Sequence, residues 1–219
     1  MTSYIEMIKK EINHLNSFDR WFIFSGILLQ LIVGIVTKSN LITMISGFSG
    51  ILAVILCAQR KLIQFLFSFI QLFTYVIIAY EQKFYGEIAE NGFYFATMLF
   101  GMYWWYKGYD NTNAEIKVKH FSKITNVLIF ILNLIIIGIV YCFLKDTNDT
   151  QPFLDSVSTV PAFIAQILMM IRYRECWIYW LIIDVASIIM WANAGNWVMV
   201  IQFIFWTINC LYALQKWKE

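Results

Sequence analysis

The sequence predicts an all-α membrane protein with eight transmembrane helices in a 1+3+1+3 arrangement. Two observations predict this fold: a regular series of hydrophobic segments, and a bias of Lys and Arg toward alternate connections between them. Hydrophobic residues make up 60% of the 219 residues and charged residues 14%, whereas a soluble domain has about 45–50% and about 25%. Little of the chain is therefore left for a soluble catalytic domain.

Eight hydrophobic segments of membrane-spanning length follow one another along the chain. A helix needs about 20 apolar residues to cross a hydrocarbon core of about 30 Å. The predicted segments are Trp21–Val36, Leu41–Ala58, Leu62–Tyr80, Phe84–Tyr106, Ile124–Leu144, Phe153–Ile171, Cys176–Asn193 and Trp197–Trp217.

The distribution of positive charge predicts the orientation of these segments. Thirteen of the sixteen Lys and Arg residues lie at the termini and in alternate connections, and the other connections hold only Lys38, Lys83 and Lys145. Cytoplasmic loops carry the excess of basic residues in membrane proteins, so we expect both termini in the cytoplasm. The basic residues are scattered over short loops, which argues against a nucleic-acid-binding face.

Residues 1–20 are predicted to form a cytoplasmic N-terminal segment. An apolar stripe at helical spacing runs along it, formed by Ile5, Ile8, Ile12 and Leu15, with Lys9, Lys10 and Glu11 opposite. Two interpretations remain open, an amphipathic helix on the inner membrane surface or a loosely ordered tail. No small-residue cleavage site follows, so we expect no signal peptide.

Residues 41–106 and 153–219 resemble two copies of one three-helix bundle. At an offset of 112, matches include Ser46 with Ser158 and Arg60 with Arg172, and a slip to 113 then pairs Gln71 with Asp184 and Trp104 with Trp217. A bundle of three helices ends on the opposite side of the membrane from where it begins, so a second copy joined to it directly would be inverted. The linker helix within residues 107–144 adds one crossing and restores the orientation of the second copy. Residues 21–36 form an extra helix outside the repeat. Transporters with parallel repeats bind their substrate near the midplane, at the repeat interface.

The strongest candidate for a binding residue is Asp184, midway along the seventh segment. A carboxylate at the bilayer centre costs about 2.5–3.5 kcal/mol, so its presence indicates function. Trp177, Trp180, Ser187 and Trp191 share its helical face at intervals of three and four residues. Indoles stack on flat rings and an acid balances positive charge. Trp177 and Trp191 are alternatively interfacial anchors.

Polar residues of other segments complete the predicted cavity. Substrate-binding candidates are Gln64, Gln71, Asn91, Tyr94, Met98, Trp177, Trp180, Asp184 and Asn209. The amides are alternatively hydrogen-bonded glue between helices, worth about 0.6–2 kcal/mol each.

The sequence offers nothing that favours catalysis or a cofactor. The four cysteines lack metal or disulfide spacing and are expected to be apolar fillers. Both histidines lie in cytoplasmic stretches, and the chain has no phosphate-binding loop of the GxxxxGK[ST] type. We therefore expect no enzyme activity, no cofactor and no metal.

Four motifs resemble the PnuC family of bacterial vitamin transporters over about residues 41–218. They are Phe84-Tyr85-Gly86-Glu87 with Asn91, Tyr94, Gly101 and Trp104; Asp155-Ser156-Val157-Ser158-Thr159; Trp177-x-x-Trp180-x-x-x-Asp184; and Lys216-Trp217-Lys218. The resemblance implies a SWEET-like fold, uptake of nicotinamide riboside across the bacterial inner membrane by facilitated diffusion, trapping by a cytoplasmic kinase and, in some members, a homotrimer.

The resemblance leaves the vitamin open. Met98 stands where the family often has Gln, and relatives carry thiamine, riboflavin or deoxynucleosides, so another vitamin or nucleoside is the first alternative. A membrane-embedded enzyme or sensor is the alternative from a different class. Such enzymes usually cluster His, Asp or Cys near one interface, and the sequence shows no such cluster.

Overall fold

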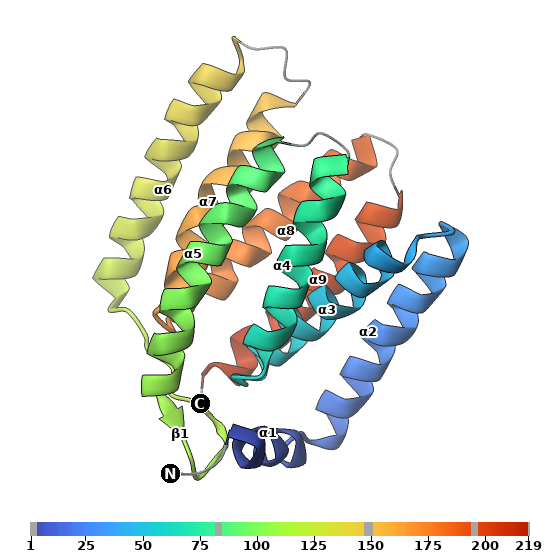
Figure 1. Cartoon of the computed structure of the whole chain (residues 1–219). Coiled ribbons are helices and arrows are strands. Elements are labelled where there is room, and N and C mark those ends of the chain that lie inside the picture. Colours follow the sequence, from blue (N-terminus) through green and yellow to red (C-terminus); the bar gives the residue numbers. More distant parts are fainter. Residues whose placement is uncertain (1–3, 82–84, 147–150, 194–196, 219) are drawn as a thin grey trace. The chain divides into compact units, whose positions relative to one another are not determined.

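The computed structural model describes residues 4–81, 85–146, 151–193 and 197–218 (Figure 1). Its described residues form nine α-helices and one short β-hairpin, which confirms the all-α prediction. The chain divides into two compact units, unit 1 with Met1–Lys117 and unit 2 with Val118–Glu219.

Each unit contains a run of consecutive helices. Unit 1 holds α1 (Tyr4–Asn13), α2 (Ser17–Val36), α3 (Leu41–Ala58), α4 (Gln64–Glu81), α5 (Tyr85–Lys107) and the hairpin of β1 (Tyr109–Asp110) and β2 (Glu115–Ile116). Unit 2 holds α6 (Lys123–Leu144), α7 (Pro152–Met170), α8 (Cys176–Asn193) and α9 (Trp197–Lys216). The eight predicted segments coincide with α2 to α9.

Side-chain caps explain where several helices begin. Asn16 accepts a hydrogen bond from the backbone N–H of Asp19, whose carboxylate accepts one from the backbone N–H of Asn16. This capping box satisfies N–H groups that have no partner inside the helix. It starts α2 at Ser17, four residues before the hydrophobic run at Trp21. Asn40 and Ser122 cap α3 and α6 in a similar way.

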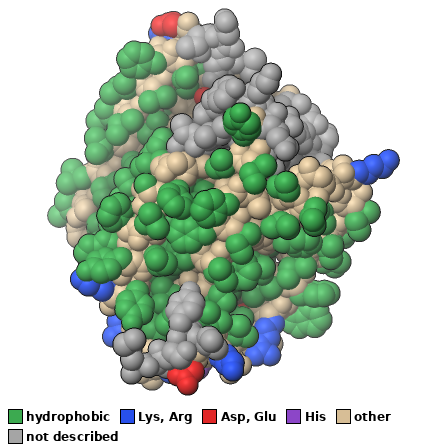
Figure 2. All heavy atoms as spheres, in the orientation of Figure 1, with side chains coloured by type: hydrophobic (Ala, Val, Ile, Leu, Met, Phe, Trp, Pro, Cys, Tyr) green, Lys and Arg blue, Asp and Glu red, His purple; other side chains and the backbone are tan. Residues whose placement is uncertain are grey.

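Four of the described helices are long and apolar enough to span a membrane. They are α2, α3, α6 and α7, with mean hydropathies of 1.6, 2.3, 3.0 and 1.5. The apolar parts of α4 and α8 are shorter, Gln64–Ile77 and Cys176–Met190. Hydrophobic side chains cover much of the coloured part of the face shown in Figure 2, and many large hydrophobic side chains of the described residues are exposed, which suits lipid contact.

Packing within each unit follows chain order. In unit 1, α3 packs against α2 and α4, and α4 packs against α5; in unit 2, α7 packs against α6 and α8, and α8 packs against α9. Small residues allow α2 and α3 to approach closely, because Met44 covers Gly34 and Gln30 covers Gly47. A Cβ atom at either glycine would overlap the covering side chain, as is typical of small-residue contacts between membrane helices.

The turn between α3 and α4 is repeated between α7 and α8. Arg60 and Arg172 have φ angles of 62° and 67°. The backbone N–H of Arg60 donates to the carbonyl of Cys57, and the backbone N–H of Lys61 donates to the carbonyl of Leu56, both at 3.0 Å. The corresponding bonds in unit 2 are Arg172 to Met169 at 3.1 Å and Tyr173 to Leu168 at 2.8 Å. Both turns end their helix with the left-handed residue and paired bonds of a Schellman motif. The predicted offset of 112 therefore holds here.

A pair of aromatic rings extends the repeat. Phe65 and Trp105 meet edge to face at 5.3 Å and 81°, and Trp177 and Trp217 meet at 5.5 Å and 83°. Both pairs obey the offset of 112, so the predicted slip to 113 is wrong. The counterpart of Trp217 is the fully buried Trp105, not Trp104, which is 41% exposed. Matching residue types alone selected the wrong one of two adjacent tryptophans.

The same offset changes the predicted counterpart of Asp184. Without a net slip between the two aromatic pairs, Asp184 corresponds to Leu72, and Gln71 corresponds to Ile183. Leu72 and Asp184 are both buried. The predicted equivalence of Gln71 and Asp184 is therefore wrong. At the equivalent position of the repeat, unit 1 has a leucine and unit 2 has a carboxylate.

The N-terminal segment forms a helix, but its buried face differs from the prediction. Met7 and Glu11 are buried, whereas Ile12 is 47% exposed. The Glu11 carboxylate accepts hydrogen bonds from the backbone N–H groups of Leu62 at 2.7 Å and Ile63 at 3.0 Å, just before α4. Placing Glu11 on the outward side was therefore wrong, because this carboxylate binds the positive end of another helix.

Candidate functional site

The predicted face of α8 is largely buried. Trp177, Asp184 and Ser187 are buried and Trp180 is half-buried, whereas Ile178 and Val185, on other faces, are exposed. The stripe therefore faces protein rather than lipid, as its composition predicted. The side chain of Trp191 lies outside the described residues.

Asp184 has a partner on α9. Its Oδ2 accepts a hydrogen bond from the Cys210 thiol, with Sγ at 3.2 Å, and each residue is only 3% exposed. The sequence predicts that Cys210 is an apolar filler, a prediction that leaves out this contact with Asp184. One signal was available, because Cys210 follows Trp206 by four residues and therefore lies on the same side of α9.

Two contacts define the register of α8 against α9. Trp177 meets Trp217, and seven residues further along α8, Asp184 meets Cys210, seven residues earlier on α9. The helices are therefore antiparallel. Trp180 lies one turn from Asp184 toward the Trp177 end, and Trp206 lies one turn from Cys210 toward the opposite end. The acid–thiol pair thus has an indole on each side along the helix axes.

Three indole N–H groups of unit 2 are buried donors without a hydrogen-bond partner among the described residues. These donors are the Nε1 atoms of Trp177, Trp180 and Trp206. A buried donor without a partner is costly, so these groups suit a bound ligand that carries acceptors. Trp177 also packs edge to face on Trp217.

Unit 1 holds five of the nine predicted residues, on α4 and α5. Gln64 is buried and accepts a hydrogen bond from the Ser68 hydroxyl at 2.8 Å. Asn91 and Met98 are buried, and Tyr94 is half-buried. By the offset of 112, Tyr94 is the counterpart of Trp206 and Met98 of Cys210. The side chain of Glu87, on the same face of α5, lies outside the described residues.

Gln71 and Asn209 complete the predicted set. Gln71 is half-buried and passes close to α3, since a Cβ on Gly50 would lie 3.2 Å from its Cγ. Asn209 is fully buried on α9, next to Cys210. The structure thus gathers Gln64, Gln71, Asn91, Tyr94 and Met98 in unit 1, and Trp177, Trp180, Asp184 and Asn209 in unit 2.

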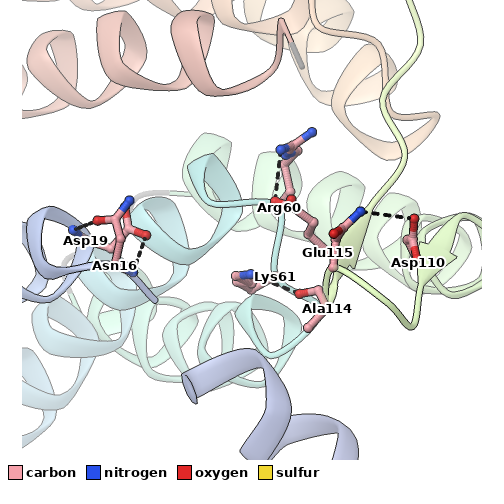
Figure 3. A network of polar contacts seen from close by, with 8 residues as sticks. Asn16, Asp19, Arg60, Lys61, Asp110, Ala114 and Glu115 are labelled. Carbon is pink, nitrogen blue, oxygen red and sulfur yellow. Dashed lines mark hydrogen bonds and ion pairs between the residues drawn. The ribbon is translucent and has the colours of Figure 1, made fainter. Parts of the chain in front are cut away.

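A separate charged network surrounds the turn between α3 and α4 (Figure 3). Arg60 forms an ion pair with Glu115 at 2.9 Å, and the Lys61 ammonium donates to the carbonyl of Ala114 at 2.9 Å. Both contacts fasten the turn to the β-hairpin. Burial raises the pKa of Glu11 above its ordinary 4.5, against the opposing effects of its hydrogen bonds and the Lys61 charge. Burial and the Glu11 carboxylate also raise the pKa of Tyr109.

Comparison with known proteins places the chain among transporters. It is 25% identical to the nicotinamide riboside transporter PnuC of Neisseria mucosa, over 92% of this chain and 83% of that one. The namesake from Haemophilus influenzae is 26% identical over 88% of this chain and 86% of its own length. The Escherichia coli protein of this name is 25% identical over 79% of this chain and 83% of its own length.

A solved structure shares the fold. The crystal structure of the vitamin B3 transporter PnuC superposes with a TM-score of 0.81, covering 99% of this chain and 97% of that one at 23% identity. A family model described as the nicotinamide mononucleotide transporter matches residues 40–219. That match begins just before α3 and includes every predicted binding residue. This chain therefore belongs to the nicotinamide mononucleotide transporter family.

Proposed function

We propose that the protein takes up nicotinamide riboside across the bacterial inner membrane by facilitated diffusion. The observation that carries the proposal is Asp184, a carboxylate buried on a membrane helix one turn from the half-buried Trp180. Nicotinamide riboside combines a flat pyridinium cation with a ribose. An indole stacks on such a ring, and a carboxylate balances its charge. The names of the relatives from three bacteria support the same substrate.

In this proposal the predicted residues of both units contribute to substrate binding. Trp177, Trp180 and Asp184 contact the charged ring, while the amides of Gln64, Gln71, Asn91 and Asn209 bond the ribose hydroxyls and the carboxamide. Tyr94 and Met98 shape the remaining surface. The supporting observation is that six of these nine side chains are buried on helices of a membrane protein, where polar groups require partners.

The proposed mechanism is alternating access. Helices α2 to α9 cross the membrane as 1+3+1+3, with α3–α5 and α7–α9 as parallel bundles, α6 as the linker helix and residues 1–20 in the cytoplasm. Rocking of the bundles exposes the substrate to each side in turn. A cytoplasmic kinase then phosphorylates the vitamin and maintains the inward gradient. The repeated turns at Arg60 and Arg172 support the parallel repeat.

Competition binding to the purified protein tests the substrate. Nicotinamide riboside should displace a labelled copy of itself at far lower concentration than thiamine, riboflavin or a deoxynucleoside. Tighter binding of one of these competitors would instead establish another vitamin on the same scaffold, as the methionine at position 98 allows. Binding of none of them would favour the membrane-embedded enzyme or sensor.

Uptake into vesicles tests the mechanism. Without kinase and ATP inside, labelled nicotinamide riboside should only equilibrate across the membrane, and adding both should cause accumulation. Accumulation without them would show coupling to an ion. Reporter fusions at each terminus should both report the cytoplasm; a C-terminus outside would contradict the eight crossings. Native mass measurement in nanodiscs tests the homotrimer implied by the family resemblance.

A further inference from the structure

We propose that Cys210 is a positioning residue that holds Asp184 in the orientation needed to bind the substrate. The inference rests on the proposed function, and it goes beyond it by giving a role to a residue outside the predicted binding set. The thiol donates to Oδ2 of Asp184 from the neighbouring helix. It is the only hydrogen bond that the Asp184 carboxylate receives within the described part of the chain.

The chemistry of this contact leaves the carboxylate incomplete. An ionised carboxylate has about four acceptor positions, and a thiol is a weak donor that fills one of them. Oδ1 receives no hydrogen bond from any described residue. A carboxylate buried so far from water favours additional partners. One oxygen is therefore held by the protein, and the other remains available for a donor or a positive charge on the ligand.

The surroundings supply complementary groups at suitable positions. Trp180 and Trp206 lie on opposite sides of the acid–thiol pair, each one helical turn away, and their indole N–H groups have no partner among the residues that the structure describes. Their places on the antiparallel helices differ by about 12 Å along the axis. The Asp184 carboxylate can accept hydrogen bonds or balance a positive charge, and an indole N–H on each side of it can donate. This arrangement suits a flat cation that carries hydroxyl and carbonyl oxygens.

The equivalent position in unit 1 lacks this chemistry. The counterparts of Asp184 and Cys210 are Leu72 and Met98, which are both buried and have no strong donor or acceptor. The same register of antiparallel helices thus holds an apolar pair in one unit and a hydrogen-bonded acid and thiol in the other. Cys210 accordingly accompanies the acid, rather than filling a space that the repeat requires.

Three variants test the role of the thiol in uptake. Cys210→Ala removes the donor and should raise the KM for nicotinamide riboside about three- to tenfold, the range for loss of a modest hydrogen bond, with the maximal rate retained. Cys210→Ser keeps a donor of similar size and should restore a KM near that of the wild type. Cys57→Ala is the matched control, because it truncates a cysteine buried on α3, and its KM should not change.

A double-mutant cycle with Asp184→Asn separates positioning from packing. If Cys210 acts through the carboxylate, Cys210→Ala should cause little further loss in the Asp184→Asn background. The same cycle is measured on the melting temperature of the ligand-free protein. That measurement tests the pair even if the wild type takes up no nicotinamide riboside, a result that would reject the proposed function alone.

Two results would overturn the inference. Independent losses for the two substitutions, in both uptake and melting temperature, would show that Cys210 and Asp184 do not act together. Equal damage from Cys210→Ser and Cys210→Ala in a protein that still folds would show that the shape of the side chain matters and its donor does not.

Discussion

The two units share their framework and differ at their centre. Each ends its first repeat helix with an arginine at positive φ, repeats the same backbone hydrogen bonds, and closes the bundle with one edge-to-face aromatic pair. Between these fixed points, unit 1 has Leu72 and unit 2 has Asp184. Backbone bonds and aromatic packing thus preserve the repeat, while the side chains that they position are free to diverge toward binding.

The units also differ in how the next helix begins. The N–H of Leu62 is bound by the carboxylate of Glu11, which belongs to α1. Its counterpart in unit 2 is the N–H of Arg174, which donates to the carbonyl of Lys119 at 3.0 Å. In unit 1 the acceptor of this N–H is therefore a titratable carboxylate from an added helix, whereas in unit 2 it is a neutral backbone carbonyl.

The largest expected effect tests the shared framework. Trp105→Ala and Trp217→Ala each remove a fully buried indole from an equivalent aromatic pair. Each should lower the free energy of unfolding by about 3–5 kcal/mol, as measured by denaturant or thermal unfolding in detergent. Trp104→Ala, at the exposed neighbouring position, is the control and should cost far less. A large loss for only one of the two buried indoles would refute the equivalence of the pairs.

The next effect tests the centre of unit 2. Asp184→Asn keeps the shape of the side chain and removes its charge, so a cationic substrate should lose about 1.5–3 kcal/mol of binding free energy. An uncharged analogue, with the pyridinium reduced to a dihydropyridine, should lose much less. Calorimetric titration of both ligands measures the difference. Equal losses accompanied by a lower melting temperature would assign Asp184 to holding the helices together.

A somewhat smaller effect tests the cap that is specific to unit 1. Glu11→Ala leaves the N–H groups of Leu62 and Ile63 without their carboxylate, which should cost about 1–3 kcal/mol of stability. Glu6→Ala, on the exposed side of the same helix, is the matched control. Thermal unfolding of the two variants gives the comparison. Similar, small losses would show that α1 contributes no cap to α4.

The pH dependence of stability sharpens the same difference between the units. Because burial raises the pKa of Glu11 above 4.5, the folded protein binds the proton more tightly than the unfolded chain does. Stability contributed by this group is complete below pH 4.5 and decreases as pH rises through the raised pKa. The melting temperature of the wild type relative to Glu11→Gln should therefore fall with rising pH and then level off. A relative increase would mean that the backbone N–H groups and Lys61 outweigh burial.

The sequence predicted the helices well because hydrophobic length is a local property. Cys176–Asn193 and Leu41–Ala58 match α8 and α3 to the residue. It failed where a long-range contact decides the outcome. Glu11 looked like a solvent-facing charge until its partners, 51 and 52 residues away, were known. The buried face of α8 was predictable from its spacing, but the donor to Asp184 was not, since it comes from a different helix.

The smallest effect concerns a contact that distinguishes the first helices of the two bundles. Gly50 on α3 corresponds to Ala162 on α7, and a Cβ on Gly50 would lie 3.2 Å from the Cγ of Gln71. Gly50→Ala should gain about 0.5–1 kcal/mol from helix propensity, partly offset by a displacement of the flexible Gln71 side chain.

Gly92→Ala isolates the propensity gain, because among the described residues no atom beyond its chain neighbours and its own helix backbone lies within 4 Å of the added Cβ. The difference between the two variants in thermal unfolding therefore measures the Gln71 contact alone. If Gln71 also binds substrate, Gly50→Ala should raise the KM for uptake although stability barely changes, and Gly92→Ala should not. An unchanged KM for both would leave Gln71 with a packing role, and the polar binding residues would then be concentrated further in unit 2.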